Sequence, residues 1–360
     1  MTITPTDETN LQLPLFEGIF ETPVWETFLR RLLQRTGAQR IRITVRNNAA
    51  PGQPALRRRV TSDRFGAGED PGEPGPLDAS AYAALRPNRV YALDEMRDFD
   101  SARAREAQDA LLKSVGIGDA RLIRVAGRGD LNAWLVLLHE REVFTAADSA
   151  LLTSLAPAIA AALALFATIG AMRLRTEAAE GSLALLGIGQ AVLDAEGRVL
   201  VADSLAQQLL PLPQASARPP SASIPALAKA CSELATALPA TRLVVTGDET
   251  FGHDLLLRPI KHHTDAPPHP AAAVATFRTA QHENRSRGAQ IIASTLGLSA
   301  REAALAEALS RGVPLVEAGK ALSLTAETTR NYSKRIYAKT GTKGQVDLVR
   351  LVLTGLAPLA

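Results

Sequence analysis

The stretch Thr325 to Lys343, TAETTRNYSKRIYAKTGTK, decides how the C-terminal part of the chain folds. Thr325 is a residue type that often precedes a helix and Gly341 is one that often ends it, so a helix is predicted between them. The stretch contains five basic residues but one acid, Glu327. Because surface helices usually mix both signs of charge, this helix is expected to face a polyanion.

Patterns on both sides of this stretch predict three more helices. Ser299 and, three residues later, Glu302 form a capping-box pattern, which predicts a helix that ends at Gly312. Residues 314–322 and 345–353 carry apolar residues at helical spacing. The end of the chain is therefore predicted to be a compact all-α unit of four helices.

This arrangement is similar to the LuxR/NarL-type helix-turn-helix of bacterial transcription regulators over about residues 294–355. Ala318 and Thr340 depart from the family, which usually carries larger aliphatic residues there, and Tyr332 replaces a common His. These departures affect packing and base preference more than the assignment. The residues in register with the family are Leu298, Arg301, Glu302, Gly312, Glu317, Leu322, Thr328, Ile336, Tyr337, Lys339, Gly341, Leu348 and Val349.

The resemblance implies a helix, about residues 325–340, that reads the major groove of double-stranded DNA. Arg330 and Lys334 are four residues apart and share a helix face, with Asn331 beside them. Arg and Lys can bond guanine, and Asn can bond adenine, so these three are the candidate base contacts. A solvated basic helix, or a face that docks an acidic protein, is the alternative interpretation. The candidate phosphate contacts are Thr328, Tyr332, Lys339 and Lys343.

The N-terminal region, about residues 15–168, resembles a GAF sensor domain. The resemblance rests on the order of its predicted elements and on the final helix, which opens at Phe144–Asp148 with Thr145 as its cap. The region has no cysteine, which argues against a thioether-linked bilin. The predicted elements are helices 23–35 and 101–115 and strands 39–46, 56–60, 89–93, 120–126 and 132–139.

A charged helical connector, residues 169–181, leads to a region that resembles a PAS domain, residues 182–280. The resemblance rests on the run from Gly189 to Leu200, and Asp203 stands where that family often has Asn. The predicted elements are strands 190–194, 198–202, 242–246, 254–260 and 272–279, a helix that includes Leu205, Leu209 and Leu210, and a helix at 224–238. The predicted fold is therefore multidomain, with two α+β sensor-type domains joined by a long helix and then the all-α unit, residues 290–360.

Composition and charge agree with this organisation. A chain of 360 residues suggests two or three domains. The single cysteine, Cys231, excludes an intramolecular disulfide and favours a reducing compartment, and no signal-peptide pattern opens the chain, so a cytoplasmic protein is expected. Residues 285–360 contain 11 basic and 5 acidic residues, a net charge of +6 within a chain total of +3. One basic module on a mildly acidic body is typical of a protein that binds nucleic acid.

One stretch, residues 151–172, has no charged residue and is long enough to cross a bilayer. It is rich in Ala, carries Pro157, and places its larger apolar residues at roughly helical spacing. A buried or dimer-forming helix is therefore expected, and a membrane segment is the alternative.

Motifs for catalysis are not evident. The sequence shows no nucleophile elbow, phosphate loop or zinc-hydrolase motif, so the protein is not expected to be an enzyme. Four histidines, His253, His262, His263 and His269, have neither a cysteine nor regular spacing, so neither a metal site nor a cofactor is predicted.

The sequence thus predicts a sequence-specific transcription regulator that binds double-stranded DNA as a homodimer. A small molecule or a protein partner is expected to act on the two sensor-like domains, and RNA polymerase is a further candidate partner. Two alternatives stay open: a signal-dependent protein-interaction module, and a regulator anchored in the membrane by residues 151–172.

Overall fold

The computed structural model divides the chain into two compact units, Met1–Leu174 and Arg175–Ala360. Of the histidines noted above, His253, His262 and His263 lie outside the residues that it describes. The described residues are 4–50, 52–62, 85–96, 102–114, 116–128, 130–210, 212, 214, 224–236, 238, 240–245, 254–261, 268–279 and 287–355.

The first unit is built on a five-stranded antiparallel sheet with the order β2-β1-β5-β4-β3. All five predicted strands are confirmed, with ends that differ by one residue. Alternating or continuous apolar residues produced these predictions because a strand turns successive side chains to opposite faces. The strands are β1 (Arg40–Asn47), β2 (Leu56–Thr61), β3 (Val90–Ala92), β4 (Asp119–Ala126) and β5 (Leu131–His139).

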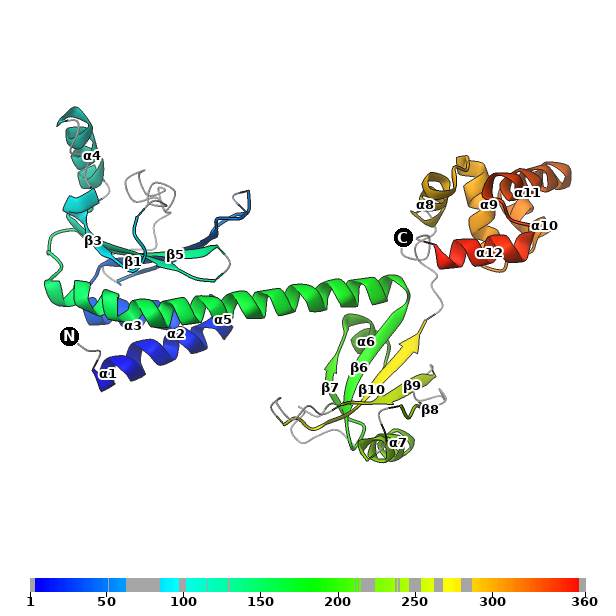
Figure 1. The fold of residues 1–360 in the computed structure, drawn as a ribbon, viewed down its shortest axis with the longest axis horizontal. Coiled ribbons are helices and arrows are strands. Elements are labelled where there is room, and N and C mark those ends of the chain that lie inside the picture. The colour runs from blue at the N-terminus through cyan, green and yellow to red at the C-terminus, as the bar shows by residue number, and fades with distance from the viewer. Residues whose placement is uncertain are drawn as a thin grey trace. The chain divides into compact units, whose positions relative to one another are not determined.

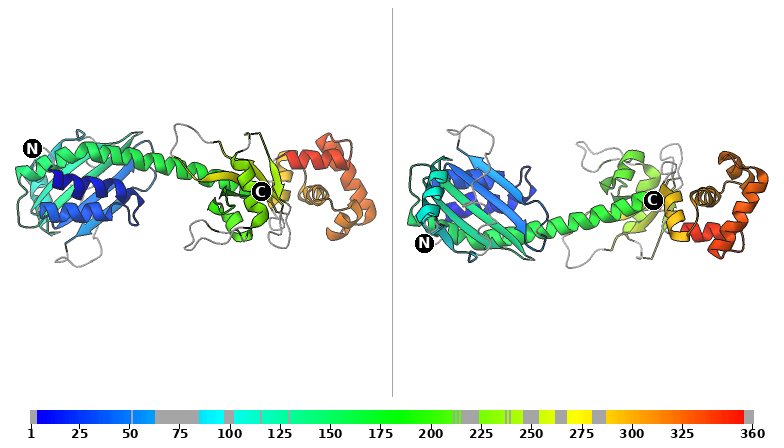
Figure 2. Two further views of the ribbon diagram at one scale, coloured as in Figure 1. Left: turned by 90° about the horizontal axis from the view of Figure 1, so that it is seen from below. Right: turned by 90° about the horizontal axis from the view of Figure 1, so that it is seen from above.

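Helices cover both faces of this sheet. The N-terminal helices, α3 (Glu26–Thr36) and the first part of α5 (Ala146–Leu185) lie on one face, and α4 (Ala102–Ser114) lies on the other (Figures 1 and 2). The prediction of a helix from residue 23 is wrong at its start, because Trp25 has a left-handed backbone (φ 62°) and α3 begins after it. The remaining short turns are α1 (Pro5–Asp7), η1 (Glu8–Gln12), α2 (Leu13–Glu17), η2 (Gly18–Phe20) and η4 (Leu93–Met96).

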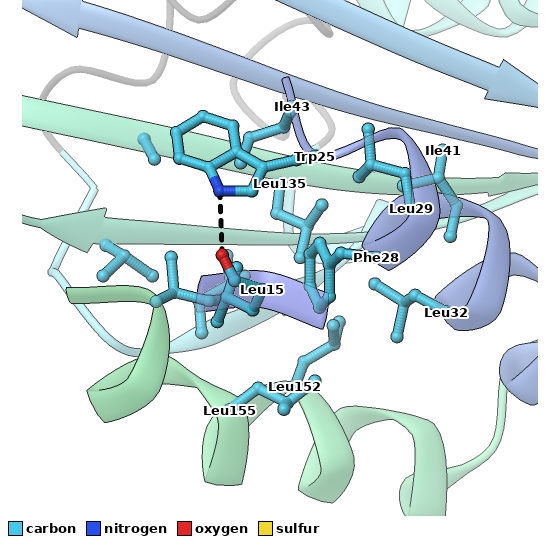
Figure 3. Close-up of a cluster of buried hydrophobic side chains, with 14 of the residues drawn as sticks. Leu15, Trp25, Phe28, Leu29, Leu32, Ile41, Ile43, Leu135, Leu152 and Leu155 are labelled. Carbon is cyan, nitrogen blue, oxygen red and sulfur yellow. Dashed lines mark hydrogen bonds between the residues drawn. The ribbon is translucent and has the colours of Figure 1, made fainter. Parts of the chain in front are cut away.

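The larger of the two apolar cores in this unit lies between the sheet, α3 and α5. Trp25 is buried there, and its indole Nε1 donates a hydrogen bond to the carbonyl oxygen of Leu15 over 3.1 Å (Figure 3). This bond satisfies the only polar atom of a large buried side chain and ties the N-terminal turns to the core. The surrounding side chains include Phe28, Leu29, Leu32, Ile41, Ile43, Leu135, Leu152 and Leu155 (Figure 3).

The apolar stretch predicted as a buried helix lies in α5. Within the described residues, α5 is the one helix long and apolar enough to cross a membrane, with a mean hydropathy of 2.1 in its most apolar window. Seven of its residues between 151 and 163 are buried, among them Leu152, Leu155 and Leu163. Apolar side chains of residues 151–163, which belong to the stretch considered as a membrane segment, thus lie in the core of the first unit.

The second unit contains another five-stranded antiparallel sheet, with the order β7-β6-β10-β9-β8. Its buried core includes Leu193, Leu257 and Cys231. Gly189 in β6 faces Phe277, and a Cβ there would lie 2.3 Å from the Phe277 ring, so the ring needs a glycine opposite it. The elements are β6 (Ile188–Asp194), β7 (Val199–Ala202), α6 (Ser204–Leu209), α7 (Pro225–Ala235), β8 (Leu243–Val245), β9 (Leu255–Pro259) and β10 (Ala271–Arg278).

Five helices follow in the same unit and enclose their own small core. The helix nearest the sheet in sequence, α8, was not predicted, whereas the other four agree with their predicted ranges to within two residues. Their core is formed by residues such as Leu305, Leu309 and Leu348. The helices are α8 (Arg287–Leu296), α9 (Ala300–Ser310), α10 (Leu315–Ala321), α11 (Ala326–Thr340) and α12 (Gln345–Thr354).

Candidate nucleic-acid interface

The basic helix predicted from the sequence is α11, and both of its ends are fixed by the residues that predicted them. The Thr325 hydroxyl accepts a hydrogen bond from the backbone N–H of Thr328 over 3.2 Å, which caps the N-terminus. At the other end Gly341 adopts φ 68°, a left-handed conformation that glycine tolerates best. The helix therefore presents its side chains from a defined start to a defined end.

Close contact between α10 and α11 sets the angle at which α11 is held. A Cβ on Gly319 would lie 2.2 Å from the Thr329 hydroxyl, so the two helices meet at a position where only glycine fits. Thr329 in turn donates a hydrogen bond to the carbonyl oxygen of Thr325 over 2.8 Å. Between the helices, Ser323 adopts φ 57°, which makes the connection a tight turn.

One side of α11 faces the core and the other faces solvent. Thr329, Ser333 and Ile336 are buried. Because a helix repeats every 3.6 residues, the opposite face is free of packing, and the three candidate base contacts lie there, all exposed. The exposed residues of α11, which form this face and its ends, are Ala326, Glu327, Arg330, Asn331, Lys334, Arg335, Ala338 and Lys339.

The four candidate phosphate contacts differ in their surroundings. Lys343 is exposed, and its backbone N–H donates to the Asp347 carboxylate over 3.2 Å. Thr328 is half-buried, and its hydroxyl shares a hydrogen bond with that of Thr325. Tyr332 is also half-buried because it packs against the core of the five helices. Their contacts with DNA stay a prediction.

Lys339, the fourth candidate, joins α11 to α9. Its ammonium lies 2.6 Å from the carboxylate of Glu302, which is 3% exposed. Burial alone would raise the pKa of Glu302, but the hydrogen bonds from Lys339 and from Ser299 outweigh it and hold this pKa below its usual value. Glu302 also closes the predicted capping box, since it accepts from the Ser299 backbone N–H over 2.8 Å. Lys339 therefore anchors α11 in addition to any contact it makes with phosphate.

Two charged residues on the exposed face were not among the predicted contacts. Arg335 lies four residues after Asn331 and is exposed, so the same spacing rule that selected Lys334 would have selected it. Glu327 lies in the first turn, where a carboxylate favours the helix N-terminus and can also accept a bond from cytosine N4. The face thus offers hydrogen-bond donors and acceptors, the latter from Glu327 and Asn331, rather than positive charge alone.

In the described part of the chain, no group of three or more His, Cys, Asp or Glu side chains could hold a metal ion. The chemistry that the exposed face of α11 offers is hydrogen bonding and charge, directed outward from a rigid helix.

Comparison with known proteins finds no matching family model and no matching curated relative. Similar solved structures include Vibrio cholerae VqmA, described as a LuxR-type receptor (14% identity, 48% of this chain and 84% of that one, TM-score 0.18). Escherichia coli SdiA (10%, 92% of each chain, TM-score 0.23) and the bacteriophytochrome RpBphP3 of R. palustris (13%, 76% and 64%, TM-score 0.35) are others. At these TM-scores the likenesses decide neither the fold nor the function of this chain.

Proposed function

We propose that this protein is a sequence-specific transcription regulator whose helix α11 reads the major groove of double-stranded DNA. The observation that carries the proposal is the exposed face of α11, which groups Arg330, Lys334 and Arg335 around Asn331. The opposite face is locked to α9 and α10 by the core, by the Gly319 contact and by the Lys339–Glu302 ion pair. A rigid helix with an outward basic face is what groove recognition requires.

In this proposal each side chain has a defined contact. Arg330 and Lys334 donate to guanine O6 and N7, and Asn331 pairs with adenine N6 and N7. Lys343 and Arg335 lie at the edge of that face or beyond it, where cations meet backbone phosphates. The phosphate contacts would position α11, and the three base contacts would specify the sequence.

The two sheet domains supply control rather than catalysis. We propose that they are GAF-like and PAS-like sensors, that a small molecule or a protein binds at least one of them, and that the protein is cytoplasmic and not an enzyme. Two copies of the chain would place two α11 helices on a two-fold DNA site with half-sites about 10 base pairs apart. RNA polymerase is then a candidate partner at regulated promoters.

The test is selection of fragmented genomic DNA by the purified full-length protein, read by sequencing. The parent should enrich fragments that share a two-fold motif, and Arg330→Ala/Lys334→Ala should lose this enrichment. Arg31→Ala/Arg141→Ala removes the same charge from exposed residues of the first unit and should leave the motif unchanged. Equal enrichment by parent and both variants, or none by the parent with or without cell extract, would exclude the proposal.

Affinity measurements separate DNA recognition from docking of an acidic protein. Against the selected duplex, log K should fall linearly with log salt with a slope of about −0.9 per phosphate neutralised. Arg330→Ala alone should cost about 1–3 kcal/mol and relax the preference at one base pair. Binding with no base preference would leave only sequence-independent attraction to phosphate, would contradict sequence recognition, and would keep the protein-docking alternative open.

Fractionation tests the membrane alternative. Because seven apolar residues of α5 between 151 and 163 lie in the core of the first unit, the protein is expected in the soluble fraction after a carbonate wash. Recovery in the washed membranes would support an anchor at residues 151–172 and would leave the proposed DNA recognition untouched.

A further inference from the structure

The second half of α5 is exposed although it carries apolar side chains. Every residue from 170 to 179 is exposed, and Met172 and Leu174 are 61% and 67% exposed. Large apolar side chains cost free energy in water, at roughly 25 cal/mol for each Å² left uncovered. A helix that keeps such side chains exposed over several turns indicates a surface that another molecule covers.

One stripe on this helix has the spacing of a coiled coil. Its residues are separated alternately by four and three positions, an average of 3.5, which is the heptad period of helices that wind around each other. Within the described residues the middle of the stripe is exposed, at Met172, Thr176 and Ala179. Ile169 packs partly against the core of the first unit, and Leu183 is half-buried. The residues of this stripe, called the α5 seam, are Leu165, Ile169, Met172, Thr176, Ala179 and Leu183.

A second stripe, which contains Leu174, has the same spacing but is poorer in large side chains. It runs through Ala167, Ala171, Leu174, Ala178, Gly181 and Leu185. Four of its six positions are Ala or Gly, which bury little surface, and the glycine also weakens a helix. The α5 seam has four large apolar residues in six positions and is therefore the stronger interface.

The charges beside the α5 seam favour a partner of the same sequence in parallel orientation. With Ile169 and Thr176 at a positions, Arg175 takes a g position and Glu180 takes the following e position. In a parallel pair, g of one helix faces the next e of the other, so Arg175 meets Glu180 twice. In an antiparallel pair g faces g, so Arg175 would face Thr168, Arg175 or Ser182 of the second copy and could not meet Glu180.

We propose that α5 forms a parallel two-stranded coiled coil with α5 of a second copy of this chain through the α5 seam. This inference deepens the proposed function and rests on it for the purpose of the dimer. The coiled coil would join the two copies of the chain that a two-fold DNA site requires. The coil itself needs no DNA, so its test can fail or succeed independently of DNA recognition.

Two neighbouring side chains provide a matched test. Met172 lies on the α5 seam and Leu174 lies outside it, and both are similarly exposed in the single chain. The full-length protein without DNA should be a dimer in sedimentation. Met172→Glu should raise the dimer dissociation constant at least about a hundredfold, because it places two charges at an apolar contact. Leu174→Glu should change the dimer dissociation constant by less than about threefold, because Leu174 takes an f position, which faces solvent in a coiled coil.

A crosslinking experiment reads the orientation without relying on a disruptive variant. Ala179 occupies a d position, and in a parallel coil the two copies of a d residue face each other. Ala179→Cys should therefore form an intermolecular disulfide under mild oxidation. An antiparallel pair places each d residue opposite an a residue, so the two Ala179→Cys side chains would not face each other. The native Cys231 is fully buried, and burial, with the charge of Asp194, raises the pKa of its thiol to about 12, so the parent should not crosslink.

Three outcomes would overturn the inference. These are a parent that is monomeric at all concentrations, a dimer broken by Leu174→Glu but not by Met172→Glu, and a dimer in which Ala179→Cys does not crosslink. If the expected results hold while genomic DNA selection fails, the coil stands and the proposed DNA recognition falls.

Discussion

The two sheets share a strand order but differ in how their faces are covered. In the first sheet, eight of the nine residues of β5 are buried, because two separate apolar cores lie on its two faces. In the second sheet, β6 alternates between buried and half-buried residues. Val201 and Val244, on the face away from the described core, are 62% and 65% exposed. Within the described residues, the same strand order therefore occurs in one sheet with a single covered face and in another with both faces covered.

The difference teaches how a strand's sequence relates to its surroundings. A strand covered on both faces is apolar at nearly every position, as in residues 133–138, whereas a strand covered on one face alternates. The pattern thus tells how many faces are covered, while the strand order follows from chain connections. This is why two domains with the same order, 2-1-5-4-3, show no repeat in sequence.

Replacing Trp134 should have the largest effect on this comparison. Trp134 is 1% exposed and fills the core between the first sheet and α4. Trp134→Ala should lower the free energy of unfolding of the first unit by about 3–5 kcal/mol. The chain has two tryptophans, and Trp25 lies in the same unit, so its fluorescence can follow urea unfolding of that unit.

The matched variant is Val244→Ala on the open face of the second sheet. It should cost less than about 0.5 kcal/mol, because the side chain is already in contact with water. Unfolding of the second sheet can be followed by chemical labelling of the buried Cys231, the only cysteine of the chain. If both variants cost the same, the two sheets do not differ as described.

The next largest difference should be in how strongly the stability of each sheet domain depends on a buried aspartate. In the first, the Asp119 carboxylate accepts from the backbone N–H of Phe144 and from the Arg121 guanidinium, each over 2.8 Å. In the second, Asp203 accepts only backbone N–H groups in the described residues, from Gln190 and Ala206, each over 2.7 Å. Asp119→Asn should therefore cost about 2 kcal/mol, because a buried cation loses its counter-charge.

Asp203→Asn should cost about 1 kcal/mol, because the amide keeps one acceptor oxygen and Asn is an equally good helix cap. The two variants are compared by Trp fluorescence and by Cys231 labelling, as above. A larger loss for Asp203→Asn would show that the second domain depends on this negative charge, which the hydrogen bonds do not suggest.

The strands of both sheets and four of the five C-terminal helices could be predicted because their signals are local. Alternation marks a strand, and Ser299 or Thr325 marks a helix start within four residues. The N-terminal turns were missed although Leu11, Leu15 and Ile19 repeat every four residues. Pro14 interrupts that pattern, and the burial of these turns depends on a core made by residues far along the chain.

Prediction of the candidate site has the same limit, because contacts between residues far apart in the sequence cannot be read from local patterns. The sequence placed Arg330, Asn331 and Lys334 on one face, because helical spacing alone decides that. It gave Lys339 a phosphate contact and did not foresee its ion pair with Glu302, 37 residues earlier. Such a pair depends on how α9 and α11 cross, and that crossing follows from the shared core that includes Leu305 and Ile336 rather than from any short motif.

Substitution of central valines should give a smaller difference between the sheets. Val136 and Val274 lie on the central strands β5 and β10, and Val136 is 1% exposed while Val274 is half-buried. Threonine has nearly the same shape but adds a hydroxyl. Val136→Thr should cost about 1–2 kcal/mol by burying that group among apolar side chains, and Val274→Thr less than about 0.5 kcal/mol. Equal costs would mean that the open face is covered in solution.

The smallest expected effect is a loss of stability of the first unit as the pH falls. Arg35 donates to Asp7 over 2.9 Å, and this bond, together with those from Thr4, lowers the pKa of Asp7 below its ordinary value of 3.8 despite partial desolvation. A carboxyl whose pKa is lower in the folded state stabilises the fold at pH values above its unfolded pKa. This stabilisation is lost as the pH falls through the folded value.

Between pH 6 and pH 3 the parent should therefore lose more stability in the first unit than Asp7→Asn does, as read by Trp fluorescence. The difference should be below about 1 kcal/mol, because the Arg35 side chain is half exposed and water screens the pair. Glu17→Gln removes an exposed carboxylate from α2 and serves as the control, which should follow the parent. If Asp7→Asn and the parent lose stability in parallel, the ion pair does not tie the N-terminal turns to α3, and their attachment rests on Leu11, Leu15 and Trp25 alone.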